Sequence, residues 1–502
     1  MDPAEIQSSS PGGEPHREAS ESTPLLAKAS AISPSRRLKR RILLLLFTFI
    51  FGTMLADSLL PAALMQVLED VICDAYYQAT HESGTTTGSA TPDMTAGACK
   101  IPAVQRELAM VRGYQQLMPV FAGVLCTVPY GLLAERIGRV RVLRLYGAGA
   151  LASLLWVLAV CYLRFAPVRW VWLSGLFLFV GGGDPVASSV VHVMVTDVAD
   201  PAARAQIFLY LHAADVVSGF FGPAVSAALM ETGHTWTVLL IAVGVLFCSA
   251  VVLLQFLPET LHLRRQGSAD GNGPAETSSE QTATGNSNLL TPLMGVISSN
   301  PQALLLLAVF APQTAARELF TVIGLQYSNA KLSLSYARGN LLLSLFQGAQ
   351  GLVVLVLLPL ITHFVANRLG WAAWPRDRLY AITSIAFMTC GLLVVGVASS
   401  VAFEAVGLLL VALGSCTTGL LMSLLGGAVL PSQVSAIYSA ALLCSIVMRS
   451  LSGPVFSGLL VAGLERGAQW IGLPFIVMAF FMTCILAASG FIKQKPLQLH
   501  NE

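Results

Sequence analysis

Six ionisable side chains lie inside long apolar stretches of this sequence. An ionisable group surrounded by hydrocarbon costs at least about 2.5–3.5 kcal/mol on insertion scales, so each needs a partner or a water-filled cavity. A carboxylate whose pKa is raised can take up a proton on one side of such a barrier and release it on the other. An arginine keeps its charge and can hold an anion. The six residues are Asp57, Asp184, Asp215, Arg317, Glu318 and Arg449.

Two of the carboxylates have informative neighbours. Asp184 follows Gly181–Gly183 and precedes Pro185, and a Gly/Pro break of this kind opens a helix where binding sites in membranes often lie. Asp184 therefore either belongs to a substrate or coupling site or is a satisfied carboxylate at a kink. His212 and Asp215 are three residues apart and share one helix face, which suggests either a proton relay or a structural pair.

The remaining four ionisable residues leave alternatives open. Asp57 either takes up protons or a cationic substrate, or hydrogen-bonds a neighbouring helix. Arg317 and Glu318 are adjacent and diverge on a helix, so we expect at least one to reach a cavity. We expect Arg449 to be buried and either to pair with Asp or Glu across that cavity or to meet an anionic substrate.

The composition is that of a membrane protein. The 502 residues are 55% hydrophobic and 11% charged, whereas soluble domains are about 25% charged. The chain has no Gly-Lys-Ser/Thr phosphate loop and no His-Glu-x-x-His pattern. We therefore expect no enzymatic activity, no cofactor, no metal ion and no nucleic-acid partner, and we expect a monomer in the lipid bilayer.

Continuous apolar runs of spanning length predict helices, because membrane β-strands would show ten-residue alternation. We predict an all-α membrane protein with twelve transmembrane helices in two pseudo-symmetric six-helix bundles. The predicted spans are 42–66, 114–134, 142–163, 170–194, 206–230, 236–257, 303–326, 339–365, 380–399, 405–426, 437–462 and 470–491. The predicted domains are a disordered cytoplasmic tail (1–41), an N-terminal bundle (42–261), a cytoplasmic linker (262–301), a C-terminal bundle (302–492) and a second cytoplasmic tail (493–502).

The distribution of Lys and Arg indicates the orientation. If the N-terminus is cytoplasmic, 19 of the 29 lie on the cytoplasmic side, eight outside and two within helices, as the positive-inside rule requires. The polar loop 67–112 then lies outside, where oxidation is possible. We expect a Cys73–Cys99 disulfide there, with two free thiols as the alternative.

An internal repeat supports two matched halves. SGFFGPAVSAALM (218–230) in the fifth predicted helix aligns with RSLSGPVFSGLLV (449–461) in the eleventh at a shared Gly-Pro pair. Parallel six-helix repeats are a recurring plan of membrane transporters.

The stretch GLLAERIGRVR (131–141) resembles the signature of the major facilitator superfamily between its second and third helices, roughly G-x-L-A-D-R-x-G-R-K. Other residues resemble the superfamily's acidic–basic element and its P-E-T element. The conformational motif so implied comprises Gly131, Glu135, Arg136, Gly138, Arg139, Asp197, Arg204 and Glu259.

Physical reasoning gives the signature residues roles of their own. Gly131 and Gly138 permit close approach and a tight turn, Glu135 can face the positive end of a neighbouring helix, and Arg139 can pair with carboxylates across the bundle. The resemblance implies that this element stabilises the outward-open state; the alternative is that its arginines only set the orientation.

The resemblance implies a secondary transporter that moves a small organic molecule by alternating access. We expect proton-coupled efflux of a drug-like or secondary metabolite; the alternatives are proton-coupled uptake of an organic nutrient and a non-transporting sensor on the same fold. We expect the plasma membrane. Glu21–Leu26 resembles a sorting signal for vacuolar or endosomal membranes, the alternative location.

Overall fold

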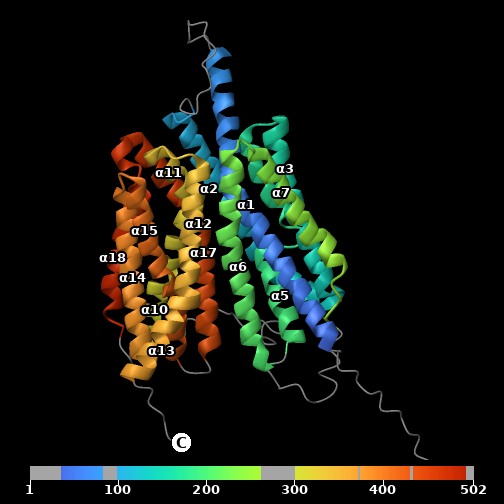
Figure 1. The fold of residues 1–502 in the computed structure, drawn as a ribbon, viewed down its shortest axis with the longest axis vertical. Helices are drawn as coiled ribbons and strands as arrows, with labels where there is room; N and C mark the ends of the chain where they lie inside the picture. Colours follow the sequence, from blue (N-terminus) through green and yellow to red (C-terminus); the bar gives the residue numbers. More distant parts are fainter. Residues whose placement is uncertain are drawn as a thin grey trace, which may run out of the picture.

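The computed structural model describes residues 36–82, 99–199, 201–261, 300–370, 373–429 and 433–492. These residues fold into two helical bundles side by side (Figure 1). The first half contains α1 (Arg36–Glu82), α2 (Pro102–Ile137), α3 (Arg139–Leu163), α4 (Ser174–Phe177), α5 (Gly183–Val198), α6 (Pro201–Glu231) and α7 (Thr235–Phe247). The second half contains α10 (Pro301–Leu319), α11 (Leu325–Leu332), α12 (Tyr336–Leu352), α13 (Leu358–Leu369), α14 (Ala373–Val397), α15 (Val401–Leu413), α16 (Thr417–Gly427), α17 (Val434–Arg466) and α18 (Leu473–Ser489).

The predicted span 170–194 is not one continuous helix. Among the described residues, eleven helices are long and apolar enough to cross a membrane, and the predicted span 170–194 is absent from them. Gly181, Gly182 and Gly183 have φ angles of 89°, 78° and 67°, a conformation that glycine adopts readily and other residues do not. The helix therefore stops after α4 and restarts as α5, at the Gly/Pro break expected beside Asp184.

The prediction of a polar loop over 67–112 is wrong for most of these residues, which are helical. α1 continues to Glu82, and α2 already begins at Pro102. Apolar side chains recur at helical spacing within this polar stretch, and Leu68 and Ile72 on α1 and Leu108 on α2 are buried. An apolar stripe of that period is enough to hold a helix against its neighbours even where the mean composition is polar.

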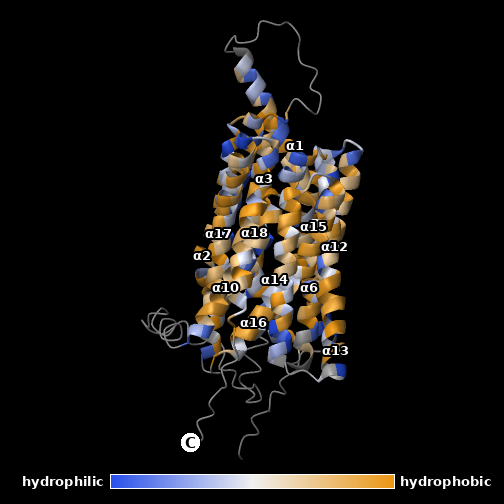
Figure 2. Cartoon of the chain, turned by 90° about the vertical axis from the view of Figure 1, so that its left-hand side faces the viewer, coloured by the Kyte–Doolittle hydropathy of each residue, from blue (hydrophilic) through white to orange (hydrophobic). Residues whose placement is uncertain are grey.

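Buried apolar side chains form two cores, one for each half. The first is built almost wholly from residues 42–257 and the second from residues 303–492. Three residues of the second half, Leu325, Tyr336 and Ala337, belong to the first core, and Ala109 of the first half belongs to the second. Figure 2 shows the apolar belt around the middle of the helices, with hydrophilic residues toward both ends. Each bundle therefore has its own core, and the two bundles meet through close helix–helix contacts of α6 with α12 and of α2 with α17.

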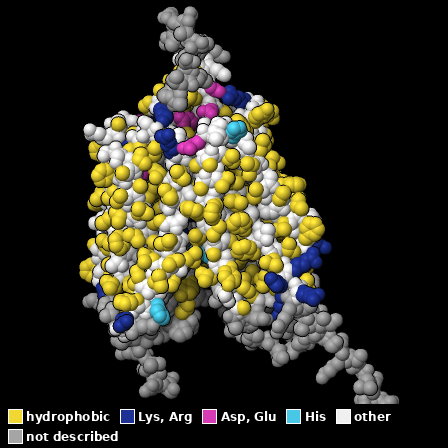
Figure 3. All heavy atoms as spheres, viewed as in Figure 1, with side chains coloured by type: hydrophobic (Ala, Val, Ile, Leu, Met, Phe, Trp, Pro, Cys, Tyr) yellow, Lys and Arg dark blue, Asp and Glu magenta, His cyan; other side chains and the backbone are white. Residues whose placement is uncertain are grey.

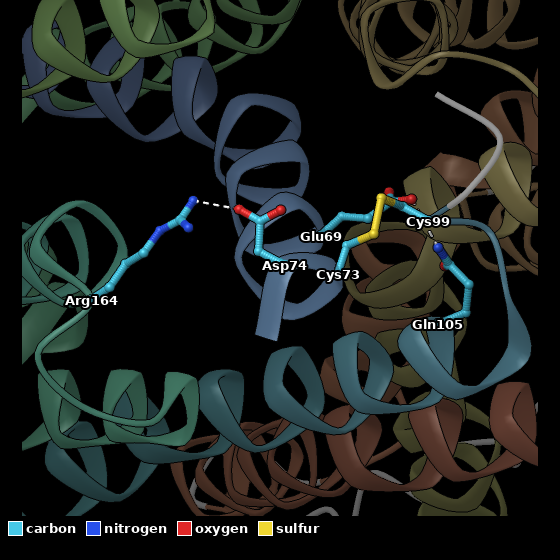
Figure 4. Close-up of a disulfide and its surroundings, with 6 residues drawn as sticks. All are labelled: Glu69, Cys73, Asp74, Cys99, Gln105 and Arg164. Carbon is cyan, nitrogen blue, oxygen red and sulfur yellow. Dashed lines mark hydrogen bonds and ion pairs between the residues drawn. A yellow bond between two sulfur atoms is a disulfide. The ribbon is translucent and has the colours of Figure 1, made fainter. Parts of the chain in front are cut away.

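The two ends of the molecule differ in chemistry. The end that bears the start of α1 and the α2–α3 turn carries the arginine-rich segments and is called the basic side. At the other end a disulfide joins Cys73 on α1 to Cys99, with 5.4 Å between their Cα atoms; this is the disulfide side. Beside it, Arg164 at the end of α3 pairs with Asp74 at 2.7 Å, as Figure 4 shows.

The halves are joined on the disulfide side. The Asn340 amide donates to the Pro223 carbonyl at 3.0 Å, and the Ser344 hydroxyl donates to the Phe220 carbonyl at 2.6 Å. These bonds link α12 to α6 in the parts of both helices nearer the disulfide. A Cβ atom on Gly453 of α17 would lie 2.5 Å from the Gly113 carbonyl of α2, so these helices touch backbone to backbone. Toward the basic side the halves diverge (Figure 3).

Candidate functional site

The turn between α2 and α3 is closed by a carboxylate from far along the chain. α2 ends at Ile137 and α3 begins at Arg139, with Gly138 between them at a φ of 105°. Glu259 accepts hydrogen bonds from the backbone amides of Arg139 at 3.0 Å and Val140 at 3.2 Å. These amides have no partner within the helix, and a carboxylate is favoured at the positive end of a helix. Glu259 therefore acts as the missing N-cap of α3.

Arg139 forms a buried ion pair with Asp197 on α5. Their side chains are 2% and 5% exposed, and Asp197 also accepts a hydrogen bond from the Thr260 hydroxyl at 3.4 Å. Arg139 therefore does pair with a carboxylate across its bundle, and the pair lies within the first half and does not join the two halves. Four of the sequence-predicted motif residues, Gly138, Arg139, Asp197 and Glu259, are thus brought together on the basic side.

The other motif residues lie apart from this cluster. A Cβ atom on Gly131 would have nothing within 4 Å, so the expected close approach is not present at that glycine. Glu135 and Arg136 are exposed at the end of α2. Arg204 lies on α6, but its side chain is outside the described part of the structure.

A cavity of about 340 Å³ inside the first half collects several of the predicted ionisable residues. We call it the carboxylate cavity. Its polar lining comes from α1, α3, α5 and α6 and consists of Thr53, Tyr146, Asp184, Ser188, His192, His212 and Asp215. Asp184, His212 and Asp215, predicted from separate stretches of sequence, therefore share one cavity, while apolar side chains such as Phe49 and Met54 complete its wall.

The broken helix aims Asp184 into this cavity. Gly182 caps α5, so Asp184 lies in the first turn of that helix, and the Tyr146 hydroxyl of α3 donates to Asp184 Oδ1 at 3.0 Å. A Cβ atom on Gly181 would lie 2.2 Å from the Tyr146 backbone nitrogen. The glycines thus let α3 approach closely enough for the tyrosine to reach the carboxylate.

Sequence reasoning missed His192, which also lines the carboxylate cavity. Its Nδ1 lies 2.6 Å from the Ser188 carbonyl, and its ring stacks on Phe208 with centroids 5.2 Å apart. Its position two helical turns after Asp184, in an otherwise apolar segment, was the available signal. Asp57 is exposed on α1 and does not line this cavity, but it is close enough to Asp184 for the two charges to repel each other.

The second half holds an ion pair between two predicted residues. Arg449 on α17 lies 3.2 Å from Glu318 on α10, and Glu318 also accepts from the Thr321 hydroxyl at 3.0 Å. The expectation that Arg449 is buried is wrong, because its side chain is 64% exposed while that of Glu318 is 21% exposed. The ion pair with Glu318 therefore leaves most of the Arg449 side chain accessible. Arg317 is also exposed.

A buried polar cluster on the disulfide side also went unpredicted. Gln105 on α2 donates to Glu69 on α1 at 3.1 Å. Gln326 on α11 donates to the Gln105 carbonyl at 2.7 Å and to its side-chain oxygen at 3.0 Å. Glu69 is 5% exposed and both glutamines are 1% exposed. The cluster therefore joins the two halves by hydrogen bonds that water does not reach.

Comparison with known proteins agrees with this arrangement. The chain is 28% identical over 440 residues to the MFS-type transporter avaK of Aspergillus versicolor, covering 87% of this chain and 89% of that protein. It is 29% identical over 458 residues to the MFS efflux pump atnC of Emericella nidulans, covering 89% of this chain and 87% of that protein.

Solved structures share the fold at low sequence identity. A bacterial homologue of the human lysosomal transporter Spinster, inward-facing and occupied, superposes with a TM-score of 0.59 and 12% identity, covering 92% of this chain and 100% of that one. A POT family transporter in complex with 5-aminolevulinic acid gives 0.57 and 14%, covering 90% and 97%. The family model of the Major Facilitator Superfamily matches residues 101–452, well over half of the chain. With two helical bundles, a glycine turn closed by Glu259 and that match, this chain is a member of the Major Facilitator Superfamily.

Proposed function

We propose that the protein exports a small organic molecule in exchange for protons by alternating access. One observation carries the proposal: the halves are hydrogen-bonded to each other on the disulfide side, while the carboxylate cavity lies inside the first half. A transporter closed on one side and holding titratable groups at its centre needs such an arrangement, because substrate and protons must reach the same groups from each side in turn.

The basic side is the cytoplasmic side in this proposal. Nineteen of the 29 Lys and Arg residues then face the cytosol, in keeping with the positive-inside rule. The disulfide faces the oxidising exterior, and the conformation is closed to the outside.

Proton exchange is assigned to the carboxylate cavity. Asp184, Asp215 and His212 line it together, and Asp57 is close enough to Asp184 that the two negative charges disfavour each other. A carboxylate in such a cavity can bind a proton in one conformation and release it in another. A proton that enters from the outside can therefore be released from this group of residues when the basic side opens.

Substrate recognition is assigned in part to the Arg449–Glu318 pair. The Arg449 side chain is exposed. Its guanidinium offers donors in a fixed fork, which suits a carboxylate or another anionic group. An anionic group on the substrate would compete with Glu318 for these donors. The two halves then divide the work, with proton handling in the first and part of the substrate binding in the second.

The conformational motif is assigned to the inward-closed state. Glu259 and the Arg139–Asp197 pair hold the α2–α3 turn rigid within the first half. Glu135 and Arg136, exposed on that turn, would meet the second half when the basic ends come together. This would stabilise the outward-open conformation.

The direction of transport and the membrane complete the proposal. Relatives named as efflux pumps favour export, and we propose the plasma membrane. Glu21–Leu26 lies outside the described residues. Imaging of a tagged chain with Leu25 and Leu26 replaced by alanine tests the vacuolar or endosomal alternative, which predicts a shift of the signal to the cell surface.

The test begins with a thermal-shift screen of organic metabolites on the purified chain at two pH values. A compound that stabilises the protein is then loaded into proteoliposomes, and its flux is followed with and without an imposed pH gradient. Asp184→Asn should abolish the effect of the gradient, and Arg449→Ala should weaken stabilisation by the compound. Glu107→Gln, which removes a carboxylate that pairs with Arg169 within the first half on the disulfide side, is the matched control. The proposal would be refuted if the flux were the same with and without the pH gradient and the same in both variants as in the unaltered protein. Net movement of the compound from the disulfide side to the basic side would indicate uptake.

A further inference from the structure

A second cavity opens on the flank of the first half, between α1 and α6. It has a volume of about 790 Å³, and α5 contributes to its floor. We call it the α1–α6 groove. Lys39 and Arg40 lie among its lining residues at the basic end, and none of the lining residues that the structure describes is acidic. The groove and the carboxylate cavity are two cavities that share one lining residue, Leu211 of α6.

The groove exists because α1 and α6 diverge toward the basic side (Figure 1). Nearer the disulfide they are in close contact: a Cβ atom on Gly222 would lie 2.5 Å from the Ser58 side chain. The Ser218 hydroxyl donates to the Phe51 carbonyl at 3.4 Å. Phe51 and Val217 are also lining residues of the groove. The point where the two helices come together therefore forms the apex of the groove.

The lining changes from buried at the floor to exposed at the walls. Leu46 and Val195 at the floor are fully buried, whereas Leu44 and Tyr210 on the walls are 56% and 52% exposed. Large apolar side chains with that exposure on a transmembrane helix are expected to face lipid. The groove therefore opens sideways into the bilayer.

The length of the groove matches one leaflet. From Lys39 at the rim to Phe51 at the apex, α1 rises about 18 Å at roughly 1.5 Å per residue. Half of a hydrocarbon core of about 30 Å is about 15 Å. Cationic groups thus lie where lipid headgroups begin, and the apolar part extends to about the middle of the membrane.

We propose that the α1–α6 groove binds one anionic phospholipid from the leaflet that surrounds the basic side. Its headgroup lies at Lys39 and Arg40, and one acyl chain lies along Phe47 toward the apex. Basic pockets between transmembrane helices on the cytoplasmic side bind anionic lipid headgroups. The acyl chain fills the space between α1 and α6 within the first half.

Native mass spectrometry of the full-length purified chain tests the proposal. The protein is titrated with dioleoyl phosphatidylserine and, separately, with dioleoyl phosphatidylcholine, which has the same acyl chains and no net charge. We expect one phosphatidylserine to be retained in preference to phosphatidylcholine. Replacing Lys39 and Arg40 by alanine should weaken that retention about ten- to thirtyfold, since each basic residue near the surface contributes about fivefold.

The matched control removes the same charge from the same helical turns. Arg37 and Arg41 flank the rim and are not lining residues of the groove. Their replacement by alanine should weaken retention much less than replacement of Lys39 and Arg40, because solvent and salt screen charges that do not contact the headgroup. A third variant, Val217→Trp, fills the exposed apex without touching the rim and should abolish preferential retention while the melting temperature is kept.

Three results would overturn the proposal. An equal loss in both double variants would mean diffuse attraction to the basic segment with no site at the groove. Equal retention of phosphatidylcholine would mean an apolar groove without headgroup recognition, such as a lateral entry for the transported molecule. Preferential retention that survives Val217→Trp would place the lipid elsewhere.

Discussion

Glu259 lies directly against Gly138, so that a Cβ atom added to the glycine would fall 2.4 Å from Glu259 Oε2. The two residues are more than a hundred positions apart, and their contact closes the α2–α3 turn. The glycine serves two purposes there. It adopts a φ of 105°, and it leaves room for the carboxylate to reach the amides of Arg139 and Val140.

Replacing Gly138 by alanine should destabilise the protein by about 1–3 kcal/mol, because the backbone conformation is strained for any other residue and the Cβ displaces Glu259. The measurement is the melting temperature of the detergent-purified chain. Gly244→Ala is the control, since nothing lies within 4 Å of its Cβ position and helical glycine is about 0.5–1 kcal/mol less favourable than alanine. Equal melting temperatures for the Gly138 variant and the unaltered protein would contradict the role assigned to the turn.

The Arg139–Asp197 pair should show strong coupling in a double-mutant cycle. Arg139→Leu leaves the buried Asp197 carboxylate without its cation, and Asp197→Leu leaves the buried Arg139 guanidinium without its anion. Each substitution should lower the free energy of unfolding by about 3–5 kcal/mol. The double variant should be markedly more stable than the sum of the two losses predicts, because it leaves no isolated charge. Strictly additive shifts in melting temperature would show that the two side chains do not depend on each other.

The sequence predicted those parts of the site that stand out from their local surroundings. Asp184 is a charge in an apolar run next to three glycines, so both its cavity position and the helix break followed from local signals. The partner of Arg139 did not, because several carboxylates were available and only the packing of α3 against α5 selects Asp197.

The buried cluster on the disulfide side was missed for a related reason. Glu69 and Gln105 lie in a stretch rich in polar residues, where composition gives no contrast. Their burial arises only when Gln326 of the second half covers them, which is a tertiary effect. The exposure of Arg449 is likewise set by the packing of α17 against α10, which the sequence of either helix alone does not reveal.

The Cys73–Cys99 disulfide should stabilise the chain by about 3 kcal/mol, since it closes a loop with a sequence separation of 26 and removes that entropy from the unfolded state. Replacing both cysteines by serine should lower the melting temperature and make it insensitive to a reducing agent. Cys248→Ser, at an exposed free thiol, should change neither the melting temperature nor its response to a reducing agent. A reductant that leaves the melting temperature of the unaltered protein unchanged would show that the bond does not form.

Gln326→Leu should open the disulfide side. The variant removes two hydrogen bonds between the halves, each worth about 0.5–1.5 kcal/mol, and so should raise the population open on that side about tenfold. A cysteine at Ser457, which is 2% exposed on α17, reports the opening when an impermeant thiol reagent is added from the disulfide side. Gln313→Leu is the matched control, because that buried amide donates to Val309 within its own helix and joins no second element. Faster labelling in Gln326→Leu alone is expected. Equal labelling in both variants would mean that the buried cluster fills space without holding the halves together.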